Sequence, residues 1–185
     1  LDISDFENHI ESIDRAIISP PKLITNCLEA DNKHLPFFLT FDDGGVSAVK
    51  IADILERKNW QGHFFITTNY INNQTFVSED DIRHIAQRGH VIGSHSCSHP
   101  KRMSGCDRNQ LLHEWSESRK RLSDIVGNPV LAASSPGGYY SNAVAETAAS
   151  AGFKALFISE PTLSCQRVGD CVVLGRYTVW RGMSG

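Results

Sequence analysis

The sequence predicts an α/β fold in which parallel strands build a distorted or incomplete (β/α) barrel. Short apolar runs of strand length alternate with segments of helical periodicity along most of the 185 residues. Such alternation is typical of strand–helix–strand units, whose parallel strands are joined by right-handed crossovers. Too few strands are recognisable to close an eight-stranded barrel. We therefore expect an open barrel, to which a strand upstream of Leu1 could belong.

The composition is that of one globular domain, and we expect residues 1–185 to form a single domain. Hydrophobic residues make up 41% of the chain and charged residues 21%, which suffices for a sizeable core. The net charge of -3, with no block of Lys or Arg, argues against a nucleic-acid partner. No apolar run approaches the roughly 18 residues of a membrane span, and residues 1–30 show no signal-peptide pattern. The composition leaves the oligomeric state open.

The cysteines indicate a reduced protein. Their number, five, is odd, and no pair has CxxC spacing, which argues against a disulfide framework and against a structural zinc cluster. A Cys165–Cys171 bridge in an oxidising compartment is the alternative. Together with the missing signal peptide, this favours a cytoplasmic location. A periplasmic or secreted location is the alternative if the chain is a processed fragment.

The N-terminal part is expected to contain one helix and the strand around which the chain is organised. Apolar residues at helical spacing predict an amphipathic helix over residues 5–18, which begins with a capping box at Ser4–Glu7. Residues 37–41 are five apolar or β-branched residues in a row, which is typical of a strand buried on both faces. Two adjacent acids, Asp42 and Asp43, follow this strand directly.

The rest of the chain continues the alternation of helices and strands. Helical periodicity, with Ser78 as an N-cap and glycines as stops, predicts helices over residues 47–58, 78–89, 107–126 and 142–151. Apolar runs predict strands over residues 63–67, 90–94, 130–133 and 155–159, and two further short runs over 172–174 and 177–180.

Carboxylates and imidazoles follow two of these strands, and together they predict a metal site. By itself an Asp-Asp-Gly sequence is also ordinary turn chemistry, so the pair Asp42 and Asp43 is ambiguous alone. After the third predicted strand, however, His95 and His99 stand four residues apart. Neutral imidazole is a common ligand of Zn2+, and one Asp with two His leaves a coordination position open for water. Parallel strands end on one side of a sheet, so we expect these residues to meet there.

Two more polar segments follow strands at the same end. Residues 134–140, with the sequence Ser-Ser-Pro-Gly-Gly-Tyr-Tyr, form a turn-rich loop that could line a pocket with two aromatic side chains. Glu160 follows the strand expected over 155–159. The candidate substrate contacts in the loop are Pro136, Gly137, Tyr139 and Tyr140.

The stretch Thr40-Phe41-Asp42-Asp43-Gly44, followed by His95-Ser96-Cys97-Ser98-His99, resembles the first two motifs of the polysaccharide deacetylase, or NodB-type, family of carbohydrate esterases. The likeness spans residues 37 to about 160. The resemblance implies a distorted (β/α) barrel, one divalent metal of the zinc type per chain, and removal of N-acetyl or O-acetyl groups from an amino-sugar glycan. It also implies that Asp43, His95 and His99 hold the metal and that Asp42 is the general base.

The chain departs from the family pattern at two positions. Ser134 stands where the third motif, Arg-x-Pro-Gly, normally has an Arg that orients the base. Arg176 stands where the family usually has a His as general acid. An Arg can stabilise an oxyanion but is a poor proton donor, because it stays protonated. Glu160 is a candidate for the acid or for a substitute partner of the base; the alternative is a solvated loop carboxylate.

These departures leave two functions open. The first is a metal-dependent deacetylase that hydrolyses an N-acetylated glycan, a divergent member of the family. The second is a catalytically impaired homologue that keeps the metal pocket and binds a glycan or a protein partner. The retained Asp42 favours the first, because a binding module has no need of a general base.

Overall fold

The structure, a computed structural model, describes residues 3–17, 19–28 and 36–179. This part of the chain contains seven strands: β1 (Thr40–Phe41), β2 (His63–Ile66), β3 (Val91–Ser94), β4 (Ala132–Ser134), β5 (Ala155–Phe157), β6 (Cys165–Val168) and β7 (Cys171–Leu174). Its α-helices are α1 (Ile3–Ala16), α2 (Ser47–Glu56), α3 (Glu79–Gln87), α4 (Arg108–Val126) and α5 (Asn142–Ser150). Its 3-10 helices are η1 (Ile24–Asn26), η2 (Thr68–Tyr70), η3 (Met103–Gly105) and η4 (Pro136–Gly138).

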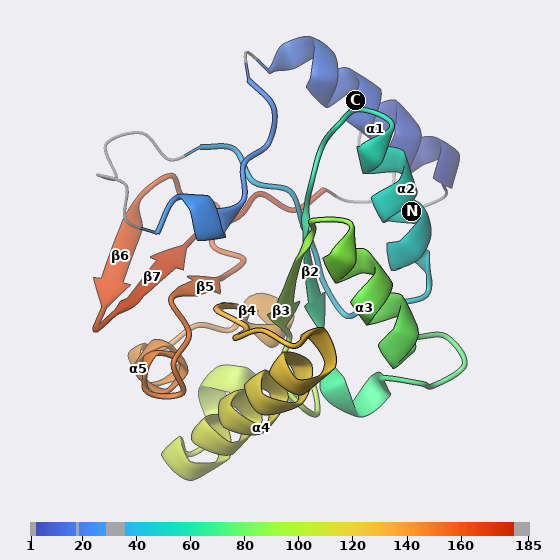
Figure 1. Cartoon of the computed structure of the whole chain (residues 1–185). Helices are drawn as coiled ribbons and strands as arrows, with labels where there is room; N and C mark the ends of the chain where they lie inside the picture. The colour runs from blue at the N-terminus through green and yellow to red at the C-terminus, as the bar shows by residue number, and fades with distance from the viewer. Residues whose placement is uncertain (1–2, 18, 29–35, 180–185) are drawn as a thin grey trace.

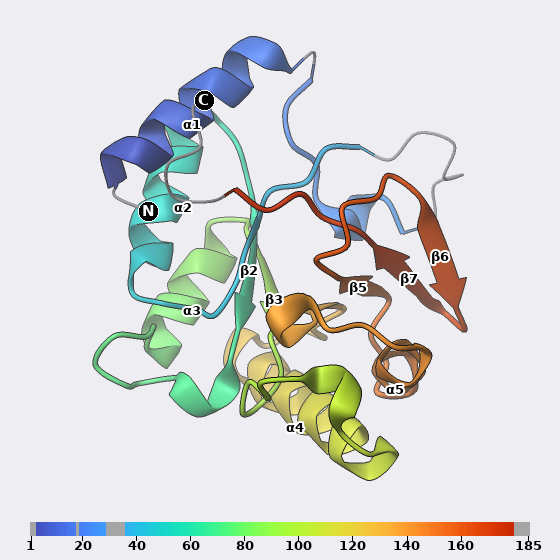
Figure 2. The ribbon, with the colours of Figure 1, turned by 180° about the vertical axis from the view of Figure 1, so that it is seen from behind.

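The strands form one mixed sheet that curls into a half-barrel surrounded by helices (Figure 1). Their order is β1-β2-β3-β4-β5-β7-β6, and each neighbouring pair is parallel except β7 and β6. Because β1 and β6 are edges, the sheet stays open; the β6–β7 hairpin lies far from α1 and α2 in both views (Figures 1 and 2). The open (β/α) barrel predicted from the sequence is confirmed.

Successive strand residues face two different hydrophobic layers. Phe64 and Ile66 of β2 pack in the larger layer, together with buried helix residues such as Leu55 and Trp115. Phe65 points the opposite way, into a smaller layer that includes Phe157 of β5. This is the alternation that a strand between two apolar layers requires. The larger layer joins the sheet to its helices, and the smaller one fills the inside of the half-barrel.

The segment around η1 packs against the inside of the half-barrel and is bonded there to a buried histidine, His63. Ile24 packs in the inner layer, and its amide donates to Nε2 of His63 over 2.9 Å. Nδ1 of the same ring therefore carries the hydrogen and donates to the carbonyl of Leu39, also over 2.9 Å. Only the neutral ring makes both bonds. Burial accordingly lowers the pKa of His63 to about 4.

Several sequence predictions differ from the structure at element ends. The strand expected over 37–41 shrinks to β1, an edge strand that pairs only with β2, and Phe37 is 40% exposed instead of buried. Helix α1 begins at Ile3, so Ser4 lies inside it and is not the N-cap; it ends at Ala16. Residues 177–179 form no strand, and Trp180 lies outside the described residues. Of the β6–β7 hairpin, the sequence predicts only the second strand, as residues 172–174.

The five cysteines are all free thiols. Cys165 lies on β6 and faces Leu174 across the hairpin, while Cys171 pairs with Val168. The reduced state expected from the sequence agrees with this arrangement, and the alternative Cys165–Cys171 bridge is not formed.

Candidate metal and catalytic site

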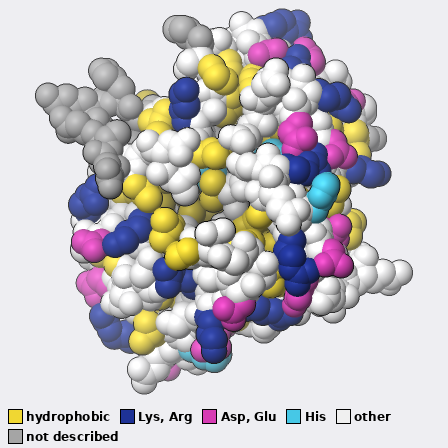
Figure 3. Space-filling view, viewed as in Figure 1, with side chains coloured by type: hydrophobic (Ala, Val, Ile, Leu, Met, Phe, Trp, Pro, Cys, Tyr) yellow, Lys and Arg dark blue, Asp and Glu magenta, His cyan; other side chains and the backbone are white. Residues whose placement is uncertain are grey.

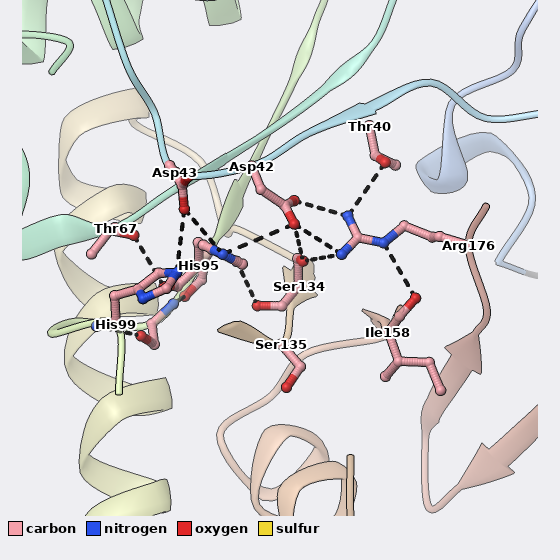
Figure 4. A network of polar contacts seen from close by, with 12 residues as sticks. Thr40, Asp42, Asp43, Thr67, His95, His99, Ser134, Ser135, Ile158 and Arg176 are labelled. Atoms are coloured by element: carbon pink, nitrogen blue, oxygen red, sulfur yellow. Dashed lines mark hydrogen bonds and ion pairs between the residues drawn. The ribbon is translucent and has the colours of Figure 1, made fainter. Parts of the chain in front are cut away.

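Three potential metal ligands meet where β1 and β3 end (Figure 4). Asp43 follows β1, His95 follows β3 directly, and His99 lies four residues further on. Oδ1 of Asp43 is 3.4 Å from Nε2 of His95 and 3.3 Å from Nε2 of His99. The ligand atoms of the three residues all lie within 4.8 Å of one another. The three metal ligands predicted from the sequence are thus brought together, with His95 buried and Asp43 open to solvent.

Strained backbone conformations place these ligands. The φ angle is 72° at Asp43, 65° at Ser96 and 55° at His99. Such left-handed conformations of residues other than glycine cost about 1–3 kcal/mol each and cluster at functional sites. At Asp43, the amide of Gly44 donates to the carbonyl of Asp42 over 3.0 Å and closes a γ-turn. The turn sends the two adjacent acids to different partners.

The protonation of His95 fits a metal ligand. Its Nδ1 lies 3.0 Å from the carbonyl of Ser134, which can only accept, so Nδ1 carries the hydrogen and Nε2 has a free lone pair. Burial lowers the pKa of His95, in spite of the neighbouring Asp42 and Asp43, and so favours the neutral ring. One carboxylate oxygen and two imidazole nitrogens at these separations are a donor set that suits a divalent cation such as Zn2+.

A second cluster next to the ligands is organised around Asp42. Nη1 of Arg176 donates to Oδ1 of Asp42 over 2.8 Å, and Nη2 donates to Oδ2 over 2.9 Å. The hydroxyl of Ser134 donates to Oδ2 over 3.2 Å and accepts from Nη2 of Arg176 over 2.9 Å. Arg176 follows β7 and its side chain is 13% exposed. The two residues that depart from the family pattern therefore touch each other and the predicted base (Figure 4).

The surroundings of Asp42 keep it ionised. Burial alone raises the pKa of this carboxyl, but His95 and the Arg176 guanidinium outweigh burial and hold the pKa below its usual value. Because the neutral form of His95 is favoured, the permanent charge of Arg176 is the lasting contribution. Oδ2 of Asp42 is 3.9 Å from Nε2 of His95, so the carboxylate lies beside the potential metal ligands without joining them.

Glu160 lies apart from this cluster. Its side chain is exposed and forms no hydrogen bond or ion pair with any residue that the structure describes. Its carbonyl, by contrast, accepts from the amide of Arg176 over 3.0 Å and so fixes the start of the segment that carries the guanidinium. The charged partner of Asp42, the predicted base, is therefore Arg176, and a catalytic role of the Glu160 carboxylate stays a prediction.

The loop predicted to contact substrate leaves the sheet next to the site. Ser134, whose carbonyl and hydroxyl contact His95 and Asp42, directly precedes Ser135 at the start of the loop (Figure 4). At Gly138 the φ angle is 69°, and a Cβ would lie 2.4 Å from Cβ of Ser159. Only glycine permits this close approach.

The candidate substrate contacts in the loop differ in accessibility. Pro136 is buried, whereas Gly137 is exposed, as is Tyr139 with 45% of its surface. The guanidinium of Arg102 lies 5.1 Å from the centre of the Tyr139 ring, a cation–π contact. The hydroxyl of Tyr140 instead turns to Oδ1 of Asn142, at the start of α5, over 3.4 Å. Tyr139 is thus the aromatic side chain of the loop that solvent reaches most easily, and contact with a substrate stays a prediction.

Sequence reasoning missed two residues that support the site. Glu114 of α4 accepts hydrogen bonds from the segment between His95 and His99. Thr40 accepts from Nη1 of Arg176 over 3.3 Å. No spacing rule joins residues so far apart in the chain. A Glu among the apolar positions of a helix was the available signal for Glu114.

The face of the molecule shown in Figure 3 carries mixed charge. On the face shown in Figure 3, Lys and Arg side chains are interspersed with Asp and Glu, and neither sign forms a continuous area. Among the residues that the structure describes, no helix combines the length and the apolar character that crossing a bilayer requires.

Comparisons with known proteins agree with the site. A sequence model of the family described as polysaccharide deacetylase matches residues 30–156. The chain is 26% identical over 132 residues to a peptidoglycan-N-acetylmuramic acid deacetylase of Bacillus subtilis, covering 70% of this chain and 48% of that protein. It is 31% identical over 92 residues to a chitin deacetylase of Colletotrichum lindemuthianum, covering 48% and 37%. The chain thus spans about half or less of the length of these relatives.

Among solved structures, the fold is similar to that of the deacetylase PplD of Streptococcus pyogenes in complex with acetate. The TM-score is 0.80 at 16% identity, and the alignment covers 98% of this chain and 82% of that one. At this identity the likeness concerns the fold. The family model, in contrast, covers more than half of the chain and includes the residues that meet at the ends of β1 and β3. The chain therefore belongs to the polysaccharide deacetylase family.

Proposed function

We propose that the chain is a metal-dependent hydrolase that removes N-acetyl or O-acetyl groups from an amino-sugar-containing polysaccharide. One observation carries this proposal: a separate, ionised carboxylate, Asp42, lies 3.9 Å from a ligand atom of the group Asp43, His95 and His99. Metal-assisted hydrolysis needs both a metal site and a base that the metal does not occupy. The relatives named as chitin and peptidoglycan deacetylases support the choice of substrate class.

Asp43, His95 and His99 would hold one divalent cation, with Zn2+ the best match to the donor set. When bound, such a cation polarises an acetyl carbonyl and lowers the pKa of a water molecule. The task of the protein is to make the two Nε2 atoms converge and to keep that of His95 unprotonated. The hydrogen bond from Nδ1 of His95 to Ser134 and the strained backbone at His99 serve this purpose.

Asp42 takes the proton of the attacking water in this mechanism. Its two oxygens accept two hydrogen bonds from Arg176 and one from Ser134. A carboxylate has about four lone-pair sites, so one remains for the water. Because the charge of Arg176 keeps Asp42 ionised, the base is ready before the substrate binds.

Arg176 acts by holding Asp42 and has no donor left for the substrate. A guanidinium has five N–H groups. Those of Arg176 bond to Asp42 twice and once each to Thr40, Ser134 and the carbonyl of Ile158. This differs from the expectation that Arg176 stabilises an oxyanion. Protonated Asp42 would then return the proton to the leaving nitrogen of an N-acetyl substrate as the C–N bond breaks.

The alternative is a catalytically impaired homologue that binds a glycan or a protein partner. Sequence comparison favoured it because Arg was missing at position 134 and His at position 176. The first reason loses its force, because Arg176 supplies a guanidinium to Asp42. The second remains, since the site has no His that could act as a separate acid among its described residues.

Acetate release decides between the two. Zinc-loaded and metal-free wild-type protein should be incubated with N-acetylated chitin oligomers and with peptidoglycan fragments, with Asp42→Asn as the matched control. We expect zinc-dependent acetate release that Asp42→Asn lowers by a factor on the order of 10² to 10⁴, the usual contribution of a general base. Zinc-loaded wild-type protein that releases no acetate from any of these glycans would support the impaired homologue.

A further inference from the structure

Glu114 is a buried acid that has no cationic partner. It lies on α4, is 8% exposed, and no Lys, Arg or His of the described chain comes within ion-pair distance of it. A buried charge is costly unless hydrogen bonds or an opposite charge compensate it. Its compensation here consists entirely of hydrogen bonds, and all of them come from one segment.

That segment joins the two histidines of the proposed metal site. Oε2 of Glu114 accepts from the amides of Cys97 and Ser98, each over 2.8 Å. Oε1 accepts from the hydroxyl of Ser98 over 2.6 Å. Hydrogen bonds to an ionised acceptor are roughly twice as strong as neutral ones. The carboxylate thus binds the backbone midway between His95 and His99.

These hydrogen bonds stabilise a segment whose backbone is strained at both ends. The φ angles of Ser96 and His99 are positive, at 65° and 55°. On its other side, the carbonyls of Ser96 and Cys97 accept from the amides of Thr68 and Asn69 in η2. The segment is therefore held between η2 and α4, and Glu114 is the sole described partner of two of its amides.

We propose that Glu114 is a positioning residue that sets the distance between His95 and His99 and thereby the affinity for the metal. The two imidazole rings lie 5.0 Å apart, centre to centre, and only His95 is fixed by a strand and a hydrogen bond of its own ring. The amide of His99 donates to the hydroxyl of Ser96 over 3.1 Å, so His99 is tied to the segment whose middle Glu114 binds. This inference rests on the proposed metal site and extends it to a residue that touches neither metal nor substrate.

The test measures zinc affinity, not turnover. Zinc is titrated into metal-free protein in competition with a chromophoric chelator. Glu114→Asp keeps the charge but retracts the carboxylate by about 1.5 Å, the length of one C–C bond. Glu114→Gln keeps the reach and an acceptor oxygen. Glu117→Ala removes an exposed acid from the same helix and serves as the charge control.

We expect Glu114→Asp to lower zinc affinity by about 10- to 100-fold, the usual effect of losing a residue that orients a ligand. Glu114→Gln should lose less, and Glu117→Ala should bind as wild type does. A general loss of stability is excluded with Ile125→Ala, a truncation in the core near the end of α4 that should leave zinc affinity unchanged.

Two outcomes would overturn the inference. If wild-type protein binds zinc and the zinc affinity of Glu114→Asp is within threefold of it, the proposed role of Glu114 is refuted but the metal site is not. Loss of affinity in Ile125→Ala equal to that in Glu114→Asp would assign the effect to stability. Wild-type protein that binds no zinc would instead refute the metal site itself, so the two failures can be told apart.

Discussion

Removal of the Arg176 guanidinium should lower turnover without removing the metal. Arg176→Met keeps much of the side-chain volume but deletes both charge-assisted hydrogen bonds to Asp42, at 2.8 and 2.9 Å, and the bond to Ser134. Asp42 then keeps one partner, the hydroxyl of Ser134 at 3.2 Å. The base remains, but its carboxylate is free to rotate and its neighbouring charge is lost.

The expected loss can be bounded from both sides. A displacement of about 1 Å at a reacting group costs about 10²-fold in rate, and complete loss of a general base costs 10²- to 10⁴-fold. Arg176→Met should therefore lower kcat by about 10²-fold, and no further than Asp42→Asn does. KM and zinc content should change little, because Arg176 contacts neither the potential ligands nor, in the proposed mechanism, the substrate.

Acetate release by single and double variants tests this dependence. If Arg176 acts through Asp42, adding Arg176→Met to Asp42→Asn should cause no further loss of kcat. Free guanidinium ions should partly restore Arg176→Met. Ser134→Arg should do the same in the Arg176→Met background, because the hydroxyl of Ser134 lies within 3.2 Å of Asp42. Multiplied losses in the double variant, or a kcat of Arg176→Met within threefold of wild type, would refute the reasoning.

Three further predictions concern the metal, the acids and the buried histidine. His95→Ala should lose the bound metal that elemental analysis finds in the wild type at about one ion per chain; equal content would contradict the ligand assignment. Asp43→Asn should lose metal and activity together, whereas Asp42→Asn should keep the metal and lose activity; metal loss in both would show that the adjacent acids share one role. The pKa of His63 is about 4 in the folded protein, below the ordinary histidine value of 6.5, so the contribution of His63 to stability is complete above pH 6.5 and is lost as the pH falls toward 4. Urea unfolding should show a loss of about 3 kcal/mol over this range, at 1.4 kcal/mol per pH unit, that is absent in His63→Gln; an equal slope in both would contradict it.

The sequence was sufficient for the parallel sheet and for the meeting of Asp43, His95 and His99. Parallel strands end on the same side, so residues that follow β1 and β3 reach the same edge of the sheet, on either side of β2. The same reasoning failed for the length of β1. Five apolar or β-branched residues in a row are typical of a strand buried on both faces, but β1 has a neighbour on one side only, and the position of a strand in the sheet depends on the whole chain. The β6–β7 hairpin, by contrast, has a readable signal, the Gly169-Asp170 turn directly before the apolar run of β7.

The hydrogen bonds that Ser134 and Arg176 make to Asp42 could not be derived from the sequence. In the sequence these two residues are two independent departures from the family motifs. Ser134 and Arg176 belong to different strand ends, and each departs from the family pattern by itself. In the structure, Nη2 of Arg176 lies 2.9 Å from the hydroxyl oxygen of Ser134, and both side chains contact the carboxylate of Asp42. An Arg at position 134 would need the volume beside Asp42 that the guanidinium of Arg176 occupies. The small side chain at position 134 therefore leaves the space that the long side chain at position 176 fills. The positive charge beside Asp42 comes from the end of β7 instead of the end of β4.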